Sequence, residues 1–287
     1  MMTQPNIESF FDEATFTVTH IVSCRTTRCA AVIDSVLDFD PKSGRTTTAA
    51  ADRVLRHLRA NDLTVSWHLE THAHADHLSA ASYLQQQVGG RIGIGSHIRE
   101  VQAVFRKIFN ADDIDADGRQ FDHLFADDEA FRIGDLEARV MHTPGHTPAC
   151  VTYRVGGDAF VGDTLFMPDY GSARCDFPGG NARTLYRSIR KVLALPDTTR
   201  LHLCHDYMPG GRAAAWESTV ARQRADNLHV HDGVTEDEFV AMRTARDQTL
   251  DIPTLMLPAV QVNVRAGHFP AAESNGVRYL KIPLNAV

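Results

Sequence analysis

The chain has 287 residues, of which 43% are hydrophobic and 23% charged, a composition typical of a globular protein long enough to bury a core. Its formal net charge of −7 argues against a general binder of nucleic acid or another polyanion. No apolar run approaches the roughly 20 residues of a membrane span, and the first residues lack the basic and apolar regions of a signal peptide. Five scattered cysteines predict no disulfide framework, so a reducing cytoplasm is the expected location.

The first half of the chain alternates strand-like and helix-like patterns. Apolar and β-branched residues predict strands over 16–22, 29–36 and 63–70. Apolar residues at spacings of three and four predict helices over 46–62, 79–90 and 96–109. The segment 71–77, "THAHADH", therefore lies in a loop between a strand and a helix.

The second half continues in the same style. Strands are predicted over 136–143, 150–155, 159–163 and 199–207, and an amphipathic helix with Asn181 as its cap over 181–196. Strands and helices thus alternate in two comparable halves. This order predicts an α/β sandwich with helices outside two sheets.

Side chains able to bind a metal ion concentrate in the loop 71–77. His72 and His74 point to one side of an extended segment, and Asp76 and His77 follow where the chain turns. Three more candidates stand at later strand ends or in tight loops: His146, Asp163 and His205. Loops at strand ends are where sites are built, and six ligands plus one carboxylate able to bridge are sufficient for two adjacent metals.

The motifs "THAHADH", "HTPGHT", "GDTLF" and "CHDY" occur in the order that is typical of the metallo-β-lactamase superfamily, which the chain resembles. Asp34 matches an early structural aspartate of that family. The resemblance spans roughly residues 16–207 and implies a four-layer αββα sandwich. It implies a single domain over 1–287, with a core at about 16–207 and a C-terminal helix and tail at about 208–287 packed on it.

Within the superfamily the chain is most similar to the persulfide dioxygenases. The similar segments are "GSARCDFPGG" at 171–180, "HDY" at 205–207, and "TEDEFVAMR" and "PTLMLPAVQVNVRAG" in the tail. The chain departs from many members by an insertion at 167–170 and by continuing past Gly267. Both departures lie near the expected mouth of the substrate site, so they concern the identity of the substrate.

This resemblance implies iron-dependent oxidation of a thiol persulfide, such as glutathione persulfide, by O2 to sulfite and thiol. One Fe²⁺ per chain would be held by His72, His146 and Asp163, a face that leaves positions open for substrate and O2. Four further residues would orient these ligands or line a vacant second metal site: His74, Asp76, His77 and His205. Carboxylates of the carrier would be held in a pocket formed by Arg174, Arg265, Asp176 and Tyr207. The resemblance also implies a homodimer.

Two alternatives stay open from the sequence. A glyoxalase II-like thioester hydrolase would use all seven ligands and two Zn²⁺ ions, with a bridging hydroxide as nucleophile. The segment "ARCDFPGG" and the absence of that family's helical glutathione-binding domain disfavour it. The other alternative is a non-catalytic redox or sulfur sensor, because Cys24 and Cys29 in "CRTTRC" are flanked by arginines that lower a thiol pKa.

Overall fold

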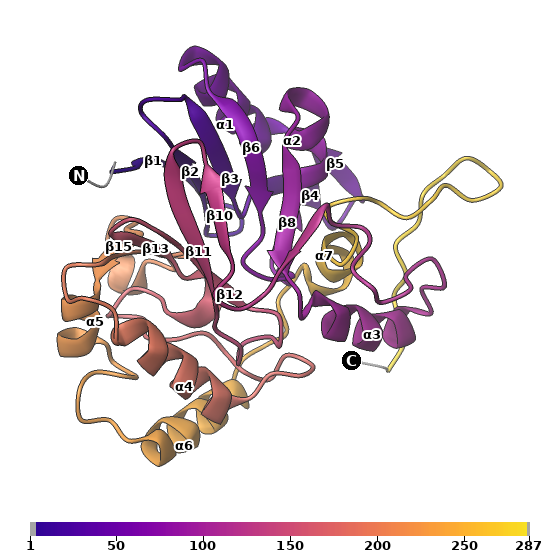
Figure 1. The fold of residues 1–287 in the computed structure, drawn as a ribbon. Helices are drawn as coiled ribbons and strands as arrows, with labels where there is room; N and C mark the ends of the chain where they lie inside the picture. Colours follow the sequence, from indigo (N-terminus) through magenta and orange to yellow (C-terminus); the bar gives the residue numbers. More distant parts are fainter. Residues whose placement is uncertain (1–3, 286–287) are drawn as a thin grey trace.

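A computed structural model describes residues 4–285 of the chain (Figure 1). The first six-stranded sheet contains, in spatial order, β1 (Asn6–Asp12), β2 (Thr17–Ser23), β3 (Cys29–Ile33), β6 (Thr64–Leu69), β8 (Arg91–Gly95) and β9 (His123–Phe125). The second contains β10 (Ala130–Ile133), β11 (Leu136–His142), β12 (Val151–Val155), β13 (Asp158–Phe160), β14 (Arg200–His202) and β15 (Glu217–Thr219). A small third sheet joins β5 (Arg45–Thr47), β4 (Val36–Asp40) and β7 (Leu78–Ser79).

Helices cover the outer faces of the two large sheets. On the first sheet lie α1 (Ala49–Ala60), α2 (Ala81–Val88), α3 (Ile98–Phe109) and α7 (Met256–Asn263). On the second lie α4 (Ala182–Leu193), α5 (Val220–Asp226) and α6 (Glu236–Asp247), which Figure 1 shows grouped away from α1 and α2. The four-layer αββα sandwich is confirmed.

The layers are held by distinct clusters of buried apolar side chains. Between the sheets, Val22, Ile33 and Leu69 of the first meet Val140 and Tyr153 of the second. Because strand side chains alternate between faces, the neighbouring positions of β2 and β3 face outward and pack under α1 and α2. The sandwich is therefore filled on three levels, and a central strand such as β2 is buried along its whole length.

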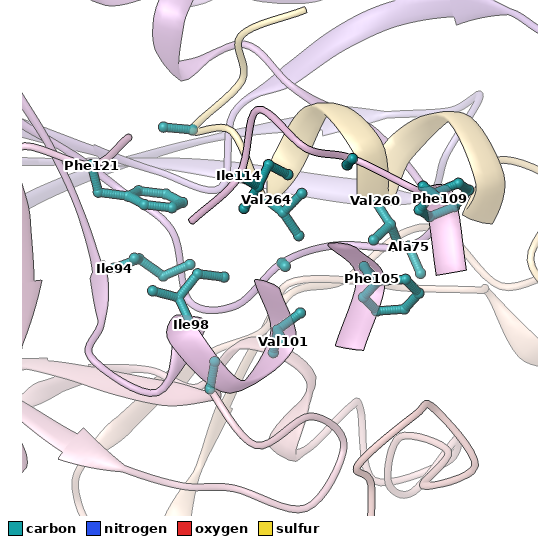
Figure 2. Close-up of a cluster of buried hydrophobic side chains, with 14 of the residues drawn as sticks. Ala75, Ile94, Ile98, Val101, Phe105, Phe109, Ile114, Phe121, Val260 and Val264 are labelled. Carbon is teal, nitrogen blue, oxygen red and sulfur yellow. The ribbon is translucent and has the colours of Figure 1, made fainter. Parts of the chain in front are cut away.

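The C-terminal segment enters this packing at several places. Val260 and Val264 lie among Ile98, Val101 and Phe105 of α3 (Figure 2). Strand β15 adds an edge to the second sheet, and β1 adds one to the first, so the sheets extend beyond the expected core of 16–207. Within residues 4–285, every helix is too short or too polar to cross a membrane.

Candidate metal centre

The loop between β6 and β7 is fastened by Asp34, which follows β3. Since β3 and β6 are parallel neighbours, their carboxyl ends meet at one edge, where Asp34 adopts a positive φ of 52°. Its carboxylate accepts hydrogen bonds from the backbone N–H and the hydroxyl of Thr71, both at 2.8 Å, and lies 3.0 Å from Nε2 of His74. The structural role expected for Asp34 therefore has a physical basis: it orients the ligand loop.

The seven predicted metal ligands converge at this edge in two groups. Within each group, one ligand atom per residue lies within 4.8 Å of the others: the first is His72, His146 and Asp163, and the second is His74, Asp76, His77 and His205. Asp163 reaches both groups, with Oδ2 at 3.6 Å from Nε2 of His146 and Oδ1 at 3.3 Å from Nε2 of His205. That position suits a carboxylate that bridges two ions.

The donor atoms fit a metal because they lack any other partner. Six of them are buried without a hydrogen bond: His72 Nε2, His74 Nδ1, Asp76 Oδ2, His77 Nε2, Asp163 Oδ1 and His205 Nε2. Buried polar atoms are normally paired, so a group of convergent unpaired donors is suited to hold a cation. Burial and the nearby imidazoles of His74 and His146 lower the pKa of His72 well below its usual value, which favours the neutral form that a metal needs.

His146 is oriented from outside the loop. Its Nδ1 donates to the backbone carbonyl of Arg174 at 2.8 Å, which leaves Nε2 for the metal. The preceding Gly145 has φ of 137° and packs against Leu185 at the start of α4. The "HTPGHT" and "ARCDF" segments are thus physically joined at the metal centre.

A cavity of about 580 Å³ opens above the metal ligands. Its floor includes Asp76, His146 and Asp163, and its walls carry the aromatic side chains of Phe166, Tyr170 and Tyr207. Three arginines also line it, Arg174, Arg243 and Arg246. The combination of apolar walls with convergent guanidinium groups suits a small anionic ligand.

The residues expected to hold a substrate fall into different places. Tyr207 and Arg174 line the cavity, and Asp176 pairs with Arg174 through two 2.6 Å contacts. This pairing raises the pKa of Arg174 and lowers that of Asp176. Arg265 is absent from the described residues that line the cavity, and its guanidinium is occupied by both carboxylate oxygens of Asp113 at 2.7 Å. The contact expected between Arg265 and a carrier stays a prediction.

Two cavity residues, Arg243 and Arg246, were not predicted from the sequence. Arg243 is buried, contacts Asp247 and donates to the carbonyl of Ser172. Arg246 is exposed, lies 5.8 Å from the ring centre of Tyr170 and has no ion pair among residues 4–285. Their spacing of three on one predicted helix was the available signal, because such residues share a face.

The cysteines of the sensor alternative lie far from this centre. Cys24 and Cys29 face each other across the β2–β3 hairpin, with the N–H of Cys24 donating to the carbonyl of Cys29 at 2.8 Å. Burial raises the pKa of the Cys24 thiol, but hydrogen bonds from Thr26 and Thr27 outweigh burial and lower it to about 6. Since Cys29 begins β3 and Asp34 follows its end, the two sites stand at opposite ends of the sheet.

The model of the metallo-beta-lactamase superfamily matches residues 21–205. The chain belongs to this superfamily. It is 60% identical to a "probable metallo-hydrolase" of Burkholderia pseudomallei, covering 98% of this chain and 99% of that one. It is 48% identical to "Glyoxylase B2" of Dictyostelium discoideum, covering 99% of both. It is 53% identical to a "beta-lactamase hydrolase-like protein" of Xylella fastidiosa, of whose length it spans only 65%.

At lower identity, the chain is also similar to ETHE1 proteins. The human mitochondrial persulfide dioxygenase ETHE1 is 28% identical over 91% of this chain and 88% of its own. The crystal structure of ETHE1 from Myxococcus xanthus superposes with a TM-score of 0.73 at 28% identity, covering 92% of this chain and 100% of that one. The histidines and aspartates of the two groups therefore form a metal-binding site of the kind expected in a metallo-beta-lactamase fold.

Proposed function

We propose that the protein oxidises a low-molecular-weight thiol persulfide, with glutathione persulfide as the best candidate, using O2. The balanced reaction converts the persulfide RSSH, O2 and water into the thiol RSH, sulfite and two protons. The observation that carries the proposal is the group His72, His146 and Asp163, of which His146 and Asp163 line a cavity that arginines also line. Two histidines and one carboxylate on one face are typical of mononuclear non-haem iron enzymes that use O2.

One Fe²⁺ held by His72, His146 and Asp163 would supply the O2 chemistry. The chain supplies orientation: the carbonyl of Arg174 fixes the ring of His146, and Asp34 fixes the loop that carries His72. Because that bond joins His146 to the backbone of Arg174, the iron ligand is tied to the segment that lines the cavity.

The cavity walls would position the persulfide. Within residues 4–285, Arg246 offers a guanidinium without a carboxylate partner, and such a group binds a carboxylate of glutathione through a charge-assisted hydrogen bond. Phe166 and Tyr207 form an apolar wall beside the ligands and exclude water from the reacting sulfur. The second group of ligands would hold water by hydrogen bonds in place of a second ion.

Hydrolysis of a thioester by two metal ions is the second candidate function. It is favoured by the four unpaired donors of His74, Asp76, His77 and His205 beside the bridging Asp163. It is also favoured by the names of relatives at 48–60% identity, which point to hydrolysis or to glyoxalase chemistry. Two Zn²⁺ ions would then supply a hydroxide nucleophile.

The two functions are separated by measuring both reactions on one preparation. Iron-loaded protein with glutathione persulfide should consume O2 and release sulfite, measured with an oxygen electrode and a sulfite assay. S-lactoylglutathione hydrolysis is followed in parallel. Thioester cleavage without O2 uptake on the persulfide would reject the oxidation in favour of hydrolysis.

Metal content gives an independent test. Protein purified without added metal should hold about one iron per chain, because only the first group binds it tightly. His72→Ala should lose this iron, whereas the matched variant His77→Ala in the second group should keep most of it. Two zinc ions per chain, with equal losses in both variants, would favour the dinuclear hydrolase.

A further inference from the structure

A single side chain from the C-terminal helix is bonded to the backbone of the ligand loop. Asn263 ends α7 and is 4% exposed. Its amide nitrogen donates to the carbonyls of His74 and His77, each at 2.8 Å, and its Oδ1 accepts from the N–H of Ser79 at 2.8 Å. Both of its N–H donors are used on this loop, since a carboxamide has two.

The loop needs such a partner because residues 70–77 form neither helix nor strand. The carbonyls of His74 and His77 therefore lie outside any strand ladder, and buried carbonyls left unpaired are costly. Here the two bonded carbonyls belong to two metal ligands, His74 and His77. The carboxamide of Asn263 replaces the missing backbone ladder at the place where the spacing of these ligands is set.

Helix α7, which carries Asn263, is fixed in place by its own packing. Val260 packs against the α3 cluster, while Val262 packs in the cluster of α1 and the first sheet. The paired Arg265 and Asp113 fasten the next turn. Gly267 has φ of 80° and passes so close to the carbonyl of Ser79 that a Cβ would lie 3.0 Å from that oxygen.

We infer that Asn263 is a positioning residue of the metal centre, which couples docking of α7 to the arrangement of the metal ligands. The inference rests on the metal site of the proposed function, but it holds for either reaction. Because coupling is reciprocal, metal binding should also stabilise the docked α7. Positioning partners of this kind typically change metal affinity about 10- to 100-fold.

The experiment compares Asn263→Ala with Gln261→Ala, using Zn²⁺ as a redox-inert probe. Gln261 is a matched control, because it lies on the same helix and is 3% exposed. Its side chain makes three hydrogen bonds of 2.8–2.9 Å, but these go to Leu257 and Lys281 and not to the ligand loop. Thermal melts are recorded with and without metal, and zinc release to a chelator is timed. Asn263→Ala should shrink the metal-dependent rise in Tm and speed release about 10- to 100-fold.

Gln261→Ala should lower both melting temperatures equally and leave zinc release unchanged. If Asn263→Ala also lowers both equally and releases zinc at the wild-type rate, Asn263 is an ordinary core residue and the inference is overturned. Hydrogen exchange of the wild-type protein decides the matter should the variant not fold. Zinc should then slow exchange in residues 256–267 more than in α1, and equal slowing would contradict the coupling.

Discussion

The arginines of the cavity differ in how available their charge is. Arg174 is committed to Asp176 and donates to the carbonyl of Asp251, whereas Arg246 lies over Tyr170 without an ion pair among residues 4–285. A guanidinium already paired gains less from a substrate carboxylate than a free one does. Arg246 is therefore the stronger candidate for binding an anionic carrier.

Arg246→Ala should raise KM for glutathione persulfide about 10- to 150-fold, the equivalent of a lost charge-assisted hydrogen bond of roughly 1.5–3 kcal/mol. The value of kcat should change little, because binding to the carrier is the same in the ground and transition states. Steady-state kinetics check this, with the exposed Arg222→Ala on α5 as the control. A KM equal to that of the control would place the carrier elsewhere.

His20 provides a buried titrating group away from the cavity. Its Nε2 donates to the carbonyl of Leu203 at 3.0 Å and its Nδ1 lies 2.9 Å from the hydroxyl of Ser9, so the neutral ring is satisfied. Burial, followed by the charge of His202, lowers its pKa from 6.5 to about 3. In the unfolded chain the ring binds a proton below 6.5, while in the folded protein it stays neutral.

The contribution of His20 to the free energy of unfolding should therefore be complete above pH 6.5. This contribution should fall as the pH drops from 6.5 toward 3. One proton taken up only by the unfolded state gives a slope of about 1.4 kcal/mol per pH unit. Denaturant unfolding of the metal-free protein between pH 4 and 6 measures it. His20→Gln, which preserves a donor and an acceptor, should reduce the slope by that amount, and parallel slopes for variant and wild type would contradict the assignment.

The metal ligands could be predicted from the sequence because their signal is local. Four of the seven occur within six residues, and the others stand near strand ends or in a tight loop. Asn263 could not be assigned its role, because its partners His74 and His77 are 189 and 186 residues away and backbone carbonyls carry no sequence signal. The surroundings of Arg265 were hidden for the same reason: the motif identified the segment, but only the fold shows Asp113 beside it.

The turn before His146 brings the metal site into close contact with helix α4. A Cβ on Gly145 would lie 2.3 Å from the backbone N and Cα of Leu185, and φ is 137°. Gly145 also accepts, through its carbonyl, the N–H of Asn181, which caps α4. The helix and the His146 loop can meet only if this position has no side chain.

Gly145→Ala should destabilise the protein by about 2–5 kcal/mol, from the sum of backbone strain and overpacking, and displace His146 from the metal site. Chemical unfolding and metal content measure the two effects. Gly157→Ala is the matched control, since nothing lies within 4 Å of its Cβ position, and it should change neither quantity appreciably. Normal metal content in Gly145→Ala would mean that the loop adjusts without moving His146.

Among the elements, long periodic helices were predicted closely and short strands were not. The helix predicted over 181–196 is α4 (Ala182–Leu193), because a stripe such as Leu185, Ile189 and Val192 marks a face unambiguously. Strand β1 was missed, since its sequence "NIESFFD" is only half-buried and shows weak alternation. The strand expected to reach 207 ends at His202, and the following segment leaves the sheet to bring His205 to the metal centre.

Side chains of the C-terminal segment 208–285 are distributed over three of the packed clusters. Val220 and Phe239 lie with α4, Val260 lies with α3, and Val262 lies with α1. Hydrogen bonds also tie the sheets together, from the N–H of Val18 to the carbonyl of Cys204 at 2.7 Å. The single domain expected from the sequence stays a prediction, and this spread of contacts leads to a test of it by unfolding.

The metal-free protein should therefore unfold in one calorimetric transition, with equal calorimetric and van't Hoff enthalpies. Phe239→Ala, which removes a fully buried ring from α6, should cost about 3–5 kcal/mol and shift this single transition to lower temperature as a whole. Added metal should raise its midpoint with concentration, because metal binds only the folded state. Differential scanning calorimetry of wild type and variant tests the argument. A second transition that moves alone in Phe239→Ala would show that residues 208–287 fold as a separate unit. The metal-ligand loop would then be held by a neighbouring domain and not by the core of its own domain.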